Sequence, residues 1–448
     1  MTKDMTTGNS TKLILLFTLP VLFGNLFQNL YSIIDTVIVG QYLGVNALAA
    51  VGSTGSLTFI VFGLVTGMTS GFGILLSQSF GARDEKMLRH YTAMSFYLCI
   101  AFSVFMTLLL LLCNDIVLHL MNTPDTIYSD TYIYIAIIYA GFPVTVFYNL
   151  LASIARALGD SRTPLYFLIV SSVLNVILDF LLVAIIPLGV AGAAIATVIA
   201  QGISAVLCLF YTWRKYPLIH FCRDDAHMKW SSIRALLSMG IPMALQFSIT
   251  GIGTVIVQSA LNLFGATYIA AYSSAMKIQN FAVQFYPSIG VAMATYAGQN
   301  YGAGKMHRIR EGVRNSMICS ALFSIALMIA AYFFFADMLS IFTSDPLGEL
   351  RGIARQFFHI SLWFYPLLGI IFIYRNTLQG IGNGLVPMLG GVAELIARAF
   401  VIFFLTAPLG FLGILLSDPI AWISALLPLI PYYYWYMSKQ KNLEEKSK

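Results

Sequence analysis

Charged residues are scarce in this 448-residue sequence. Asp, Glu, Lys and Arg make up only 10% of it, hydrophobic residues make up 58%, and the mean hydropathy is +0.81. Soluble domains contain about 25% charged residues, so this composition excludes an ordinary soluble protein and indicates a polytopic helical membrane protein. The net charge of +6 is not gathered on a soluble module, which argues against a nucleic-acid partner.

The motifs of ATP-driven pumps and of common hydrolases are also missing. The sequence contains no Walker-type phosphate-binding loop, no HExxH and no GxSxG, and its six histidines are scattered. The S-x-x-K pattern from Ser274 to Lys277 has no companion motif. We therefore expect no enzyme, and an ion gradient rather than ATP as the energy source for any transport. An integral membrane enzyme is the remaining alternative from a different class.

Cysteine is rare, and its pattern points to no metal. The five cysteines have no CxxC spacing, so we expect free thiols, no structural metal and no cofactor. The chain does not open with the short apolar core and cleavage site of a signal peptide, so we expect its first apolar segment to be a retained span.

Long apolar runs dominate what is present. Windows of about 20 apolar residues predict twelve spans, near residues 13–42, 46–79, 88–113, 131–155, 164–186, 190–213, 236–262, 266–297, 313–336, 354–378, 386–408 and 411–437. The expected fold is therefore an all-α integral membrane protein with twelve transmembrane helices.

The positive residues indicate the orientation. All but four of the 25 Lys and Arg residues, including Arg223 and Lys448, fall in the terminal segments or in loops on the same side as the N-terminus. The exceptions are Arg351 and Arg355 outside, and Lys277 and Arg398 within spans. Since Lys and Arg collect in cytoplasmic loops, we expect both termini in the cytoplasm and the protein in the cytoplasmic (inner) membrane.

The two sets of six spans form an internal repeat. QSFGAR at residues 78–83 recurs as QNYGAG at residues 299–304, an offset of 221, and Pro164 matches Pro387 at an offset of 223. An even number of spans per copy places both copies in the same orientation, so the pseudo-two-fold axis should follow the membrane normal. The predicted domains are an N-lobe of residues 1–214, a cytoplasmic linker of residues 215–234 and a C-lobe of residues 235–448. Parallel repeats of this kind are typical of transporters.

A carboxylate lies in the middle of the first span. Asp35 belongs to a polar stripe with Asn25, Gln28, Tyr31 and Ser32 on one side of an apolar helix. A charge at mid-bilayer costs about 2.5–3.5 kcal/mol on insertion scales, which makes Asp35 a candidate functional residue. A purely structural hydrogen-bonding role is the alternative.

The sequence resembles the multidrug and toxic compound extrusion (MATE) family over essentially its whole length. The resemblance rests on TLP followed by NLYSIIDTVIVGQYLG in the first span, on the GAR and GAG turns after the second and eighth, and on ARALGDSRTP after the fourth. It implies two six-helix lobes that export amphipathic, often cationic compounds in exchange for Na+ or H+, hence xenobiotic export and antibiotic resistance.

The resemblance also implies a cation site in the N-lobe. Its aspartate on helix one matches Asp35, its Asn-x-x-x-Asp pair on helix five matches Asn175 and Asp179, and its tyrosine and threonine match Tyr139 and Thr197. Tyr132 and Tyr134 are alternatives to Tyr139 for the tyrosine ligand. A solvated position near the outer end of its helix is the alternative for Asp179. Two facing carboxylates cannot both stay ionised in a low-dielectric pocket without a cation between them. Na+ bound at Asp35, Asn175 and Asp179, or a shared proton, would satisfy this requirement.

The C-lobe carries different polar residues. Neither Asp35 nor Asp179 has an acidic counterpart at the repeat offset, which favours coupling in the N-lobe alone. A neutral stripe faces either a cavity or a neighbouring helix; it consists of Gln246, Thr250, Thr254, Gln258 and Asn262. Glu394 and Arg398, four residues apart, are expected to form an intrahelical ion pair, and Lys277 is hypothesised to pair with Asp418 or Glu394.

The partners expected are small-molecule drugs and organic cations, with the lipid bilayer as surroundings and a monomeric chain. Candidate substrate-binding residues are Gln28, Tyr31, Met68, Phe281 and Met293. A flippase for lipid-linked precursors is the alternative from the wider superfamily, although twelve spans and few intramembrane Lys or Arg residues argue against it.

Overall fold

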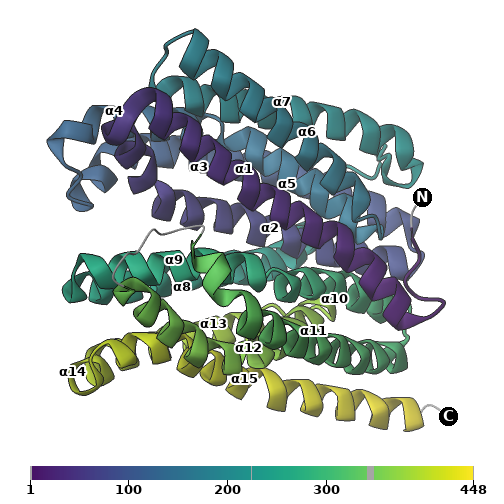
Figure 1. Cartoon of the computed structure of the whole chain (residues 1–448). Coiled ribbons are helices and arrows are strands. Elements are labelled where there is room, and N and C mark those ends of the chain that lie inside the picture. Colours follow the sequence, from purple (N-terminus) through teal and green to yellow (C-terminus); the bar gives the residue numbers. More distant parts are fainter. Residues whose placement is uncertain (1–2, 223, 341–347, 447–448) are drawn as a thin grey trace. The chain divides into compact units, whose positions relative to one another are not determined.

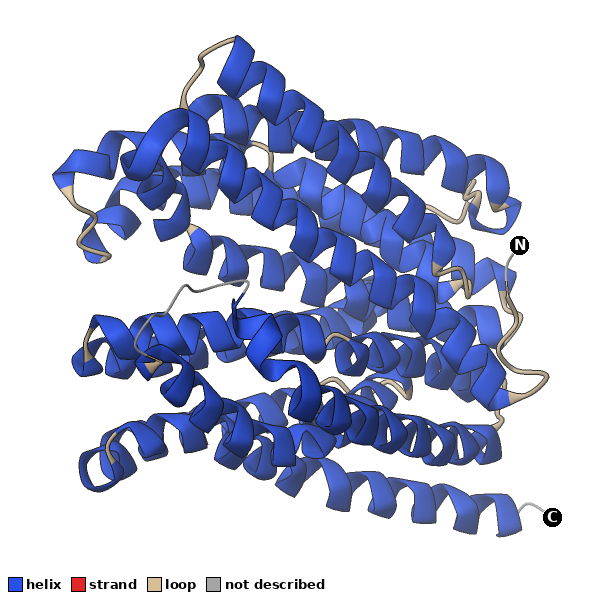
Figure 2. Ribbon diagram, in the orientation of Figure 1, coloured by secondary structure: helices blue, strands red, loops and turns tan. Residues whose placement is uncertain are grey.

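A computed structural model of the chain describes residues 3–222, 224–340 and 348–446. Every regular element in these ranges is a helix, and they contain no strand (Figure 2). The prediction of an all-α protein is therefore confirmed. Arg223 and Lys448, which the topology prediction counts as cytoplasmic positive residues, lie outside the described residues.

Long helices with short connections make up the first half of the chain (Figure 1). They are α1 (Ser10–Ser53), α2 (Gly55–Gly81), α3 (Glu85–Leu120), α4 (Asp125–Ala140), α5 (Phe142–Ala157), α6 (Arg162–Asp179), the π-helix η1 (Phe180–Ile185), α7 (Val190–Lys215) and the 3-10 helix η2 (Pro217–Ile219).

The second half has the same style of organisation. Its elements are α8 (Trp230–Leu261), the 3-10 helix η3 (Asn262–Phe264), α9 (Ala266–Ala282), α10 (Phe285–Gly302), α11 (Met306–Ser340), α12 (Glu349–Gly380), α13 (Leu385–Phe400), the π-helix η4 (Val401–Leu405), α14 (Thr406–Leu409) and α15 (Phe411–Lys446).

Membrane-spanning candidates follow the apolar windows closely. Ten helices of the described chain are long and apolar enough to cross a membrane, and the pair α4 and α5, bent by 46°, makes an eleventh. The predicted span 131–155 is thus broken at Gly141, and the predicted span 266–297 is broken between α9 and α10. The predicted span 46–79 begins too early, because α1 continues past a non-helical Gly44 to Ser53.

The chain forms two compact units. Unit 1 contains the residues up to Asp4 together with Leu19–Ala244, and unit 2 contains Met5–Thr18 and the residues from Leu245 onward. The boundary after Thr18 falls inside α1 and the boundary after Ala244 inside α8, whereas the boundary after Asp4 precedes α1. The lobe and linker boundaries expected from the sequence remain a prediction.

The internal repeat is visible in the backbone. Glycines with positive φ recur at the predicted offsets: Gly44 with Gly265, Gly159 with Gly382, and Gly189 with Gly410. Such φ values are sterically easy only for glycine. Corresponding side chains also cap corresponding helices, since Asp160 accepts from the backbone N–H of Thr163 and Asn383 from that of Val386. A π-helix follows α6 in unit 1 and α13 in unit 2.

Small residues allow close helix packing inside unit 1. A Cβ added to Gly67 would lie 2.5 Å from the backbone of Ala244, and one added to Gly71 would lie 2.6 Å from Gly240. The backbones of α2 and of the first half of α8 therefore touch, as in small-residue contacts between membrane helices.

Candidate functional site

The structure brings Asp35 of α1 and Asp179 of α6 together inside unit 1. Their carboxyl groups are close enough to interact electrostatically. Asp35 is half-buried and Asp179 has no exposed surface. The alternative of a solvated Asp179 at a helix end is therefore wrong. Two carboxylates this close repel each other unless they share a proton or a cation.

Apolar packing sets the position of α1 at this level. Val39 of α1 belongs to one buried cluster with Tyr134 and Ile138 of α4 and Ala193 and Ala194 of α7. These small alanines let α7 approach closely, and α6 and α7 lie side by side (Figure 1). Asp179 is the last residue of α6 and is followed directly by the π-helix η1. Such π-segments occur frequently at functional sites.

Oxygen atoms without donors gather at this position. One carboxylate oxygen of Asp35, both oxygens of Asp179 and the amide oxygen of Asn175 are buried, and no hydrogen-bond donor in the described chain reaches them. The Asn175 amide is oriented by Thr197, because Nδ2 of Asn175 donates to Thr197 Oγ1 at 3.3 Å while Thr197 Oγ1 donates to the carbonyl of Ala193 at 3.1 Å. The amide oxygen of Asn175 therefore stays available as a ligand. Hard oxygen ligands of this kind suit an alkali or alkaline-earth cation rather than a soft metal.

Asp35 and Asp179 form an acid pair, and Tyr134 is the tyrosine of α4 that interacts with it. Tyr134 and Tyr31 both interact electrostatically with Asp35 and Asp179. The predicted ligand Tyr139 is instead buried in the main hydrophobic core of unit 1. Five residues correspond to about 140° around a helix, so Tyr134 and Tyr139 point in different directions. The geometry favours Tyr134 over Tyr139.

The turn between α5 and α6 holds a second buried carboxylate, Asp160, outside the membrane-spanning helices. Its Oδ2 accepts hydrogen bonds from Lys215 Nζ at 2.7 Å, from Thr163 Oγ1 at 2.6 Å and from the hydroxyl of Tyr216. Burial raises the pKa of Asp160, but these hydrogen bonds outweigh burial and hold the pKa well below its usual range. Asp160 thus joins the start of α6 to the end of α7, the two helices that carry Asn175, Asp179 and Thr197.

Unit 2 contains a buried ion-pair network instead of an acid pair. Glu394 Oε2 lies 3.8 Å from Arg398 Nη1, which confirms the predicted intrahelical pair. The other oxygen of Glu394 pairs with Arg375 of α12. Arg398 Nε donates to Asp418 Oδ1 at 3.1 Å.

The hypothesis that Lys277 pairs with Asp418 or Glu394 is wrong. Both carboxylates are held by arginines, and Lys277 is exposed on α9 with no ion pair to any residue that the structure describes. The sequence prediction counts Arg375, near the end of the predicted span 354–378, as a cytoplasmic positive residue, whereas α12 continues to Gly380 and Arg375 is buried.

The predicted substrate-binding residues lie in several environments. Gln28 is exposed and Tyr31 half-buried on α1, and Phe281 is half-buried near the end of α9. Met68 is buried in α2, where its sulfur packs against Gly240. Met293 is buried in unit 2, and its sulfur accepts a hydrogen bond from Ser316 at 3.0 Å. Their role in substrate binding stays a prediction.

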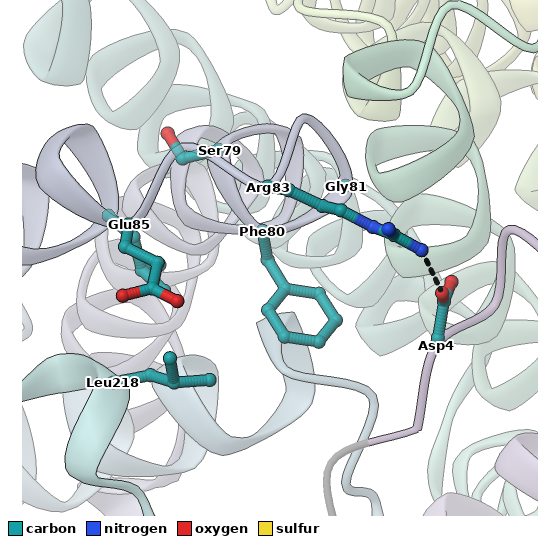
Figure 3. Close-up of a pocket in the computed structure, with 8 residues that line it drawn as sticks. Asp4, Ser79, Phe80, Gly81, Arg83, Glu85 and Leu218 are labelled. Atoms are coloured by element: carbon teal, nitrogen blue, oxygen red, sulfur yellow. Dashed lines mark ion pairs between the residues drawn. The ribbon is translucent and has the colours of Figure 1, made fainter.

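A pocket of about 200 Å³ lies at the end of α2 in unit 1. Figure 3 shows Arg83 pointing toward Asp4, 3.9 Å away, at the edge of this pocket. Its lining consists of Asp4, Ser79, Phe80, Gly81, Arg83, Glu85, Leu88 and Leu218. None of the residues around the acid pair belongs to it.

Comparison with known proteins agrees with this architecture. The family model described as MatE matches residues 20–181 and 239–404. "Probable multidrug resistance protein YoeA" of Bacillus subtilis is 29% identical over 439 residues, which cover 96% of this chain and 94% of that protein. "Probable multidrug resistance protein NorM" of Thermotoga maritima is 26% identical over 377 residues, covering 83% and 80% of the two chains.

A solved structure shares the fold. A crystal structure of MATE in complex with MaL6 superposes with a TM-score of 0.91 at 20% sequence identity, and it covers 99% of this chain and 100% of its own. This match agrees with a twelve-helix transmembrane fold. Because the family model covers most of both halves, the chain belongs to the MatE family.

Proposed function

We propose that this protein is a secondary active antiporter that exports amphipathic, mostly cationic organic compounds in exchange for Na+ or H+. The observation that carries the proposal is the close pair of half-buried Asp35 and fully buried Asp179, with the unpartnered oxygen of Asn175 beside it. Such a pair needs a proton or a small cation to offset its repulsion. The names of the relatives YoeA and NorM support multidrug resistance as the biological setting.

In the proposed mechanism, the cation enters from outside and neutralises the pair Asp35 and Asp179. The loss of repulsion changes how α1 packs in unit 1, and drug is displaced outward. Return to the inward-facing state releases the cation inside the cell. Only a difference in the affinities of cation and drug for the two states can drive this exchange, so the two ligands should antagonise each other.

The remaining assignments belong to the same proposal. Drug would be contacted by the predicted substrate-binding residues, and Thr197 and Tyr134 would support the cation site. The monomeric chain would lie in the cytoplasmic membrane with both termini in the cytoplasm, as the distribution of Lys and Arg favours.

Transport into or out of liposomes tests the proposal. Purified protein is reconstituted with a fluorescent organic cation, and efflux is followed under an imposed Na+ gradient or an imposed pH gradient. One gradient should drive efflux in the wild type, and Asp35→Asn and Asp179→Asn should each abolish the gradient-driven part. Asp224→Asn, the same change at an exposed position, is the matched control. Undiminished driven efflux in both site variants would refute the site.

A further inference from the structure

The buried charges of unit 2 occupy positions that the repeat relates to the cation site of unit 1. Arg398 of α13 corresponds to Asn175 of α6 at the offset of 223 residues, and Asp418 of α15 corresponds to Thr197 of α7 at the offset of 221. The side-chain contact recurs as well. Asn175 Nδ2 donates to Thr197 Oγ1 at 3.3 Å, and Arg398 Nε donates to Asp418 Oδ1 at 3.1 Å. Corresponding helices are therefore joined by neutral groups in unit 1 and by an ion pair in unit 2.

The network around Arg398 is buried and balanced in charge. Arg375, Glu394 and Arg398 have only 7%, 4% and 5% of their surfaces exposed. Arg375 and Arg398 contact different oxygens of Glu394, and Arg398 also holds Asp418. Two arginines thus offset two carboxylates, as buried ions require. Without Arg398, Glu394 would keep Arg375, whereas Asp418 would lose its ion-pair partner.

The guanidinium of Arg398 fits a space that α8 and α9 leave for it. A Cβ added to Gly253 of α8 would lie 2.8 Å from Arg398 Nη1. Tyr272 of α9 interacts electrostatically with both Arg398 and Asp418. The buried Nη1 finds no hydrogen-bond acceptor in the described chain. The guanidinium of Arg398 is therefore stabilised at this buried position by the opposite charges of the carboxylates, because its hydrogen bonds are not all satisfied.

We propose that Arg398 acts as a fixed cation in unit 2. Its guanidinium takes the position that corresponds, through the repeat, to the position of the exchangeable cation beside Asn175 in unit 1. Cation coupling is thereby confined to unit 1, with one exchange site per chain. The inference rests on the proposed function of the acid pair, although the residues concerned lie outside it. It follows that removal of the guanidinium uncovers a site for a monovalent cation at Asp418.

Sodium binding to purified variants tests this inference in a background that lacks the first site. The thermal unfolding midpoint is measured against NaCl, with choline chloride at equal ionic strength as reference, and bound radioactive Na+ is counted. Asp179→Asn alone should show no Na+ dependence. Adding Arg398→Ala should make the midpoint rise with Na+ concentration and restore about one bound Na+ per chain. Adding Asp418→Asn as well should abolish both effects.

The controls separate this inference from the proposed function. Asp179→Asn with Arg398→Lys keeps a fixed positive charge and should bind no Na+. If the wild type does not respond to Na+, that result counts against the proposed cation site of unit 1 and not against this inference. The inference depends only on the comparison of Asp179→Asn with the double variant Asp179→Asn, Arg398→Ala. The inference is overturned if Arg398→Ala gains no Na+ binding, or if the gain survives Asp418→Asn. Recovery of the Arg398→Ala protein in NaCl but not in choline chloride supports it, and failure in both salts overturns it.

Discussion

Asn175 donates a hydrogen bond from its side-chain amide to the hydroxyl of Thr197, 3.3 Å away, and this contact joins α6 to α7 beside the acid pair. The hydroxyl can accept because its own proton is donated to the carbonyl of Ala193. The contact leaves the amide oxygen of Asn175 without a donor. A threonine on one helix thus determines which atom of Asn175 is available to a cation.

Replacing Thr197 by valine should weaken cation binding. Valine keeps the shape of threonine but offers no acceptor, so the Asn175 amide loses its orientation. The cation concentration that gives half-maximal efflux from proteoliposomes should rise about tenfold, which corresponds to about 1.4 kcal/mol. Thr197→Ser keeps the hydroxyl and should behave like the wild type. An unchanged half-saturating concentration in Thr197→Val would show that this orientation has no role.

Replacing Gly71 by alanine should destabilise unit 1. The added Cβ would lie 2.6 Å from the backbone of Gly240, so α2 and α8 would have to separate. Overpacking of this kind typically costs about 1–3 kcal/mol in the free energy of unfolding. Thermal unfolding of the purified variant measures the effect. Gly52→Ala is the control, because a Cβ there meets nothing within 4 Å; equal stability of the two variants would contradict the packing argument.

Replacing Asp160 by asparagine should destabilise the junction of α6 and α7. The change removes charge-assisted hydrogen bonds from Lys215 and Tyr216, and about 1.5–3 kcal/mol of the free energy of unfolding should be lost. Asp224→Asn, at an exposed position, should have little effect.

The effect of Asp160→Asn should also depend on pH in one direction. Folding lowers the pKa of Asp160, so its contribution is complete above the unfolded pKa of about 3.9 and is lost only as the pH falls through the lower folded pKa. The difference in stability from the wild type should be constant from about pH 5 to about pH 8 and should shrink in stronger acid. A difference that grows on acidification would contradict the assignment.

Much of this architecture can be read from the sequence, because the bilayer imposes simple rules. Apolar runs of spanning length predict the helices, and the offsets of 221 and 223 residues predict the repeat that the glycines with positive φ display. The four-residue spacing of Asn175 and Asp179 places both on one helix face. Family resemblance then links them to Asp35.

The remaining features depend on contacts between segments distant in the sequence. Arg375 lies near the end of the predicted span 354–378 and is counted there as a cytoplasmic charge, and its partner Glu394, 19 residues further along, is not deducible from local spacing. The choice between Tyr134 and Tyr139 depends on how α4 is rotated against α1. The helix break at Gly141 lies two residues before Pro143. The proline alone does not predict a break, because many membrane spans tolerate proline.

Competition between cation and drug for the purified protein tests the central claim most directly. The dissociation constant of a fluorescent organic cation is measured against Na+ concentration at fixed pH, and against pH without Na+, for the wild type and for Asp179→Asn. If Asp35 and Asp179 share one cation, Na+ or H+ should weaken drug binding in the wild type, and drug should weaken cation binding by the same factor. Asp179→Asn should then remove this antagonism while drug still binds. Antagonism of equal size in both proteins would contradict the account.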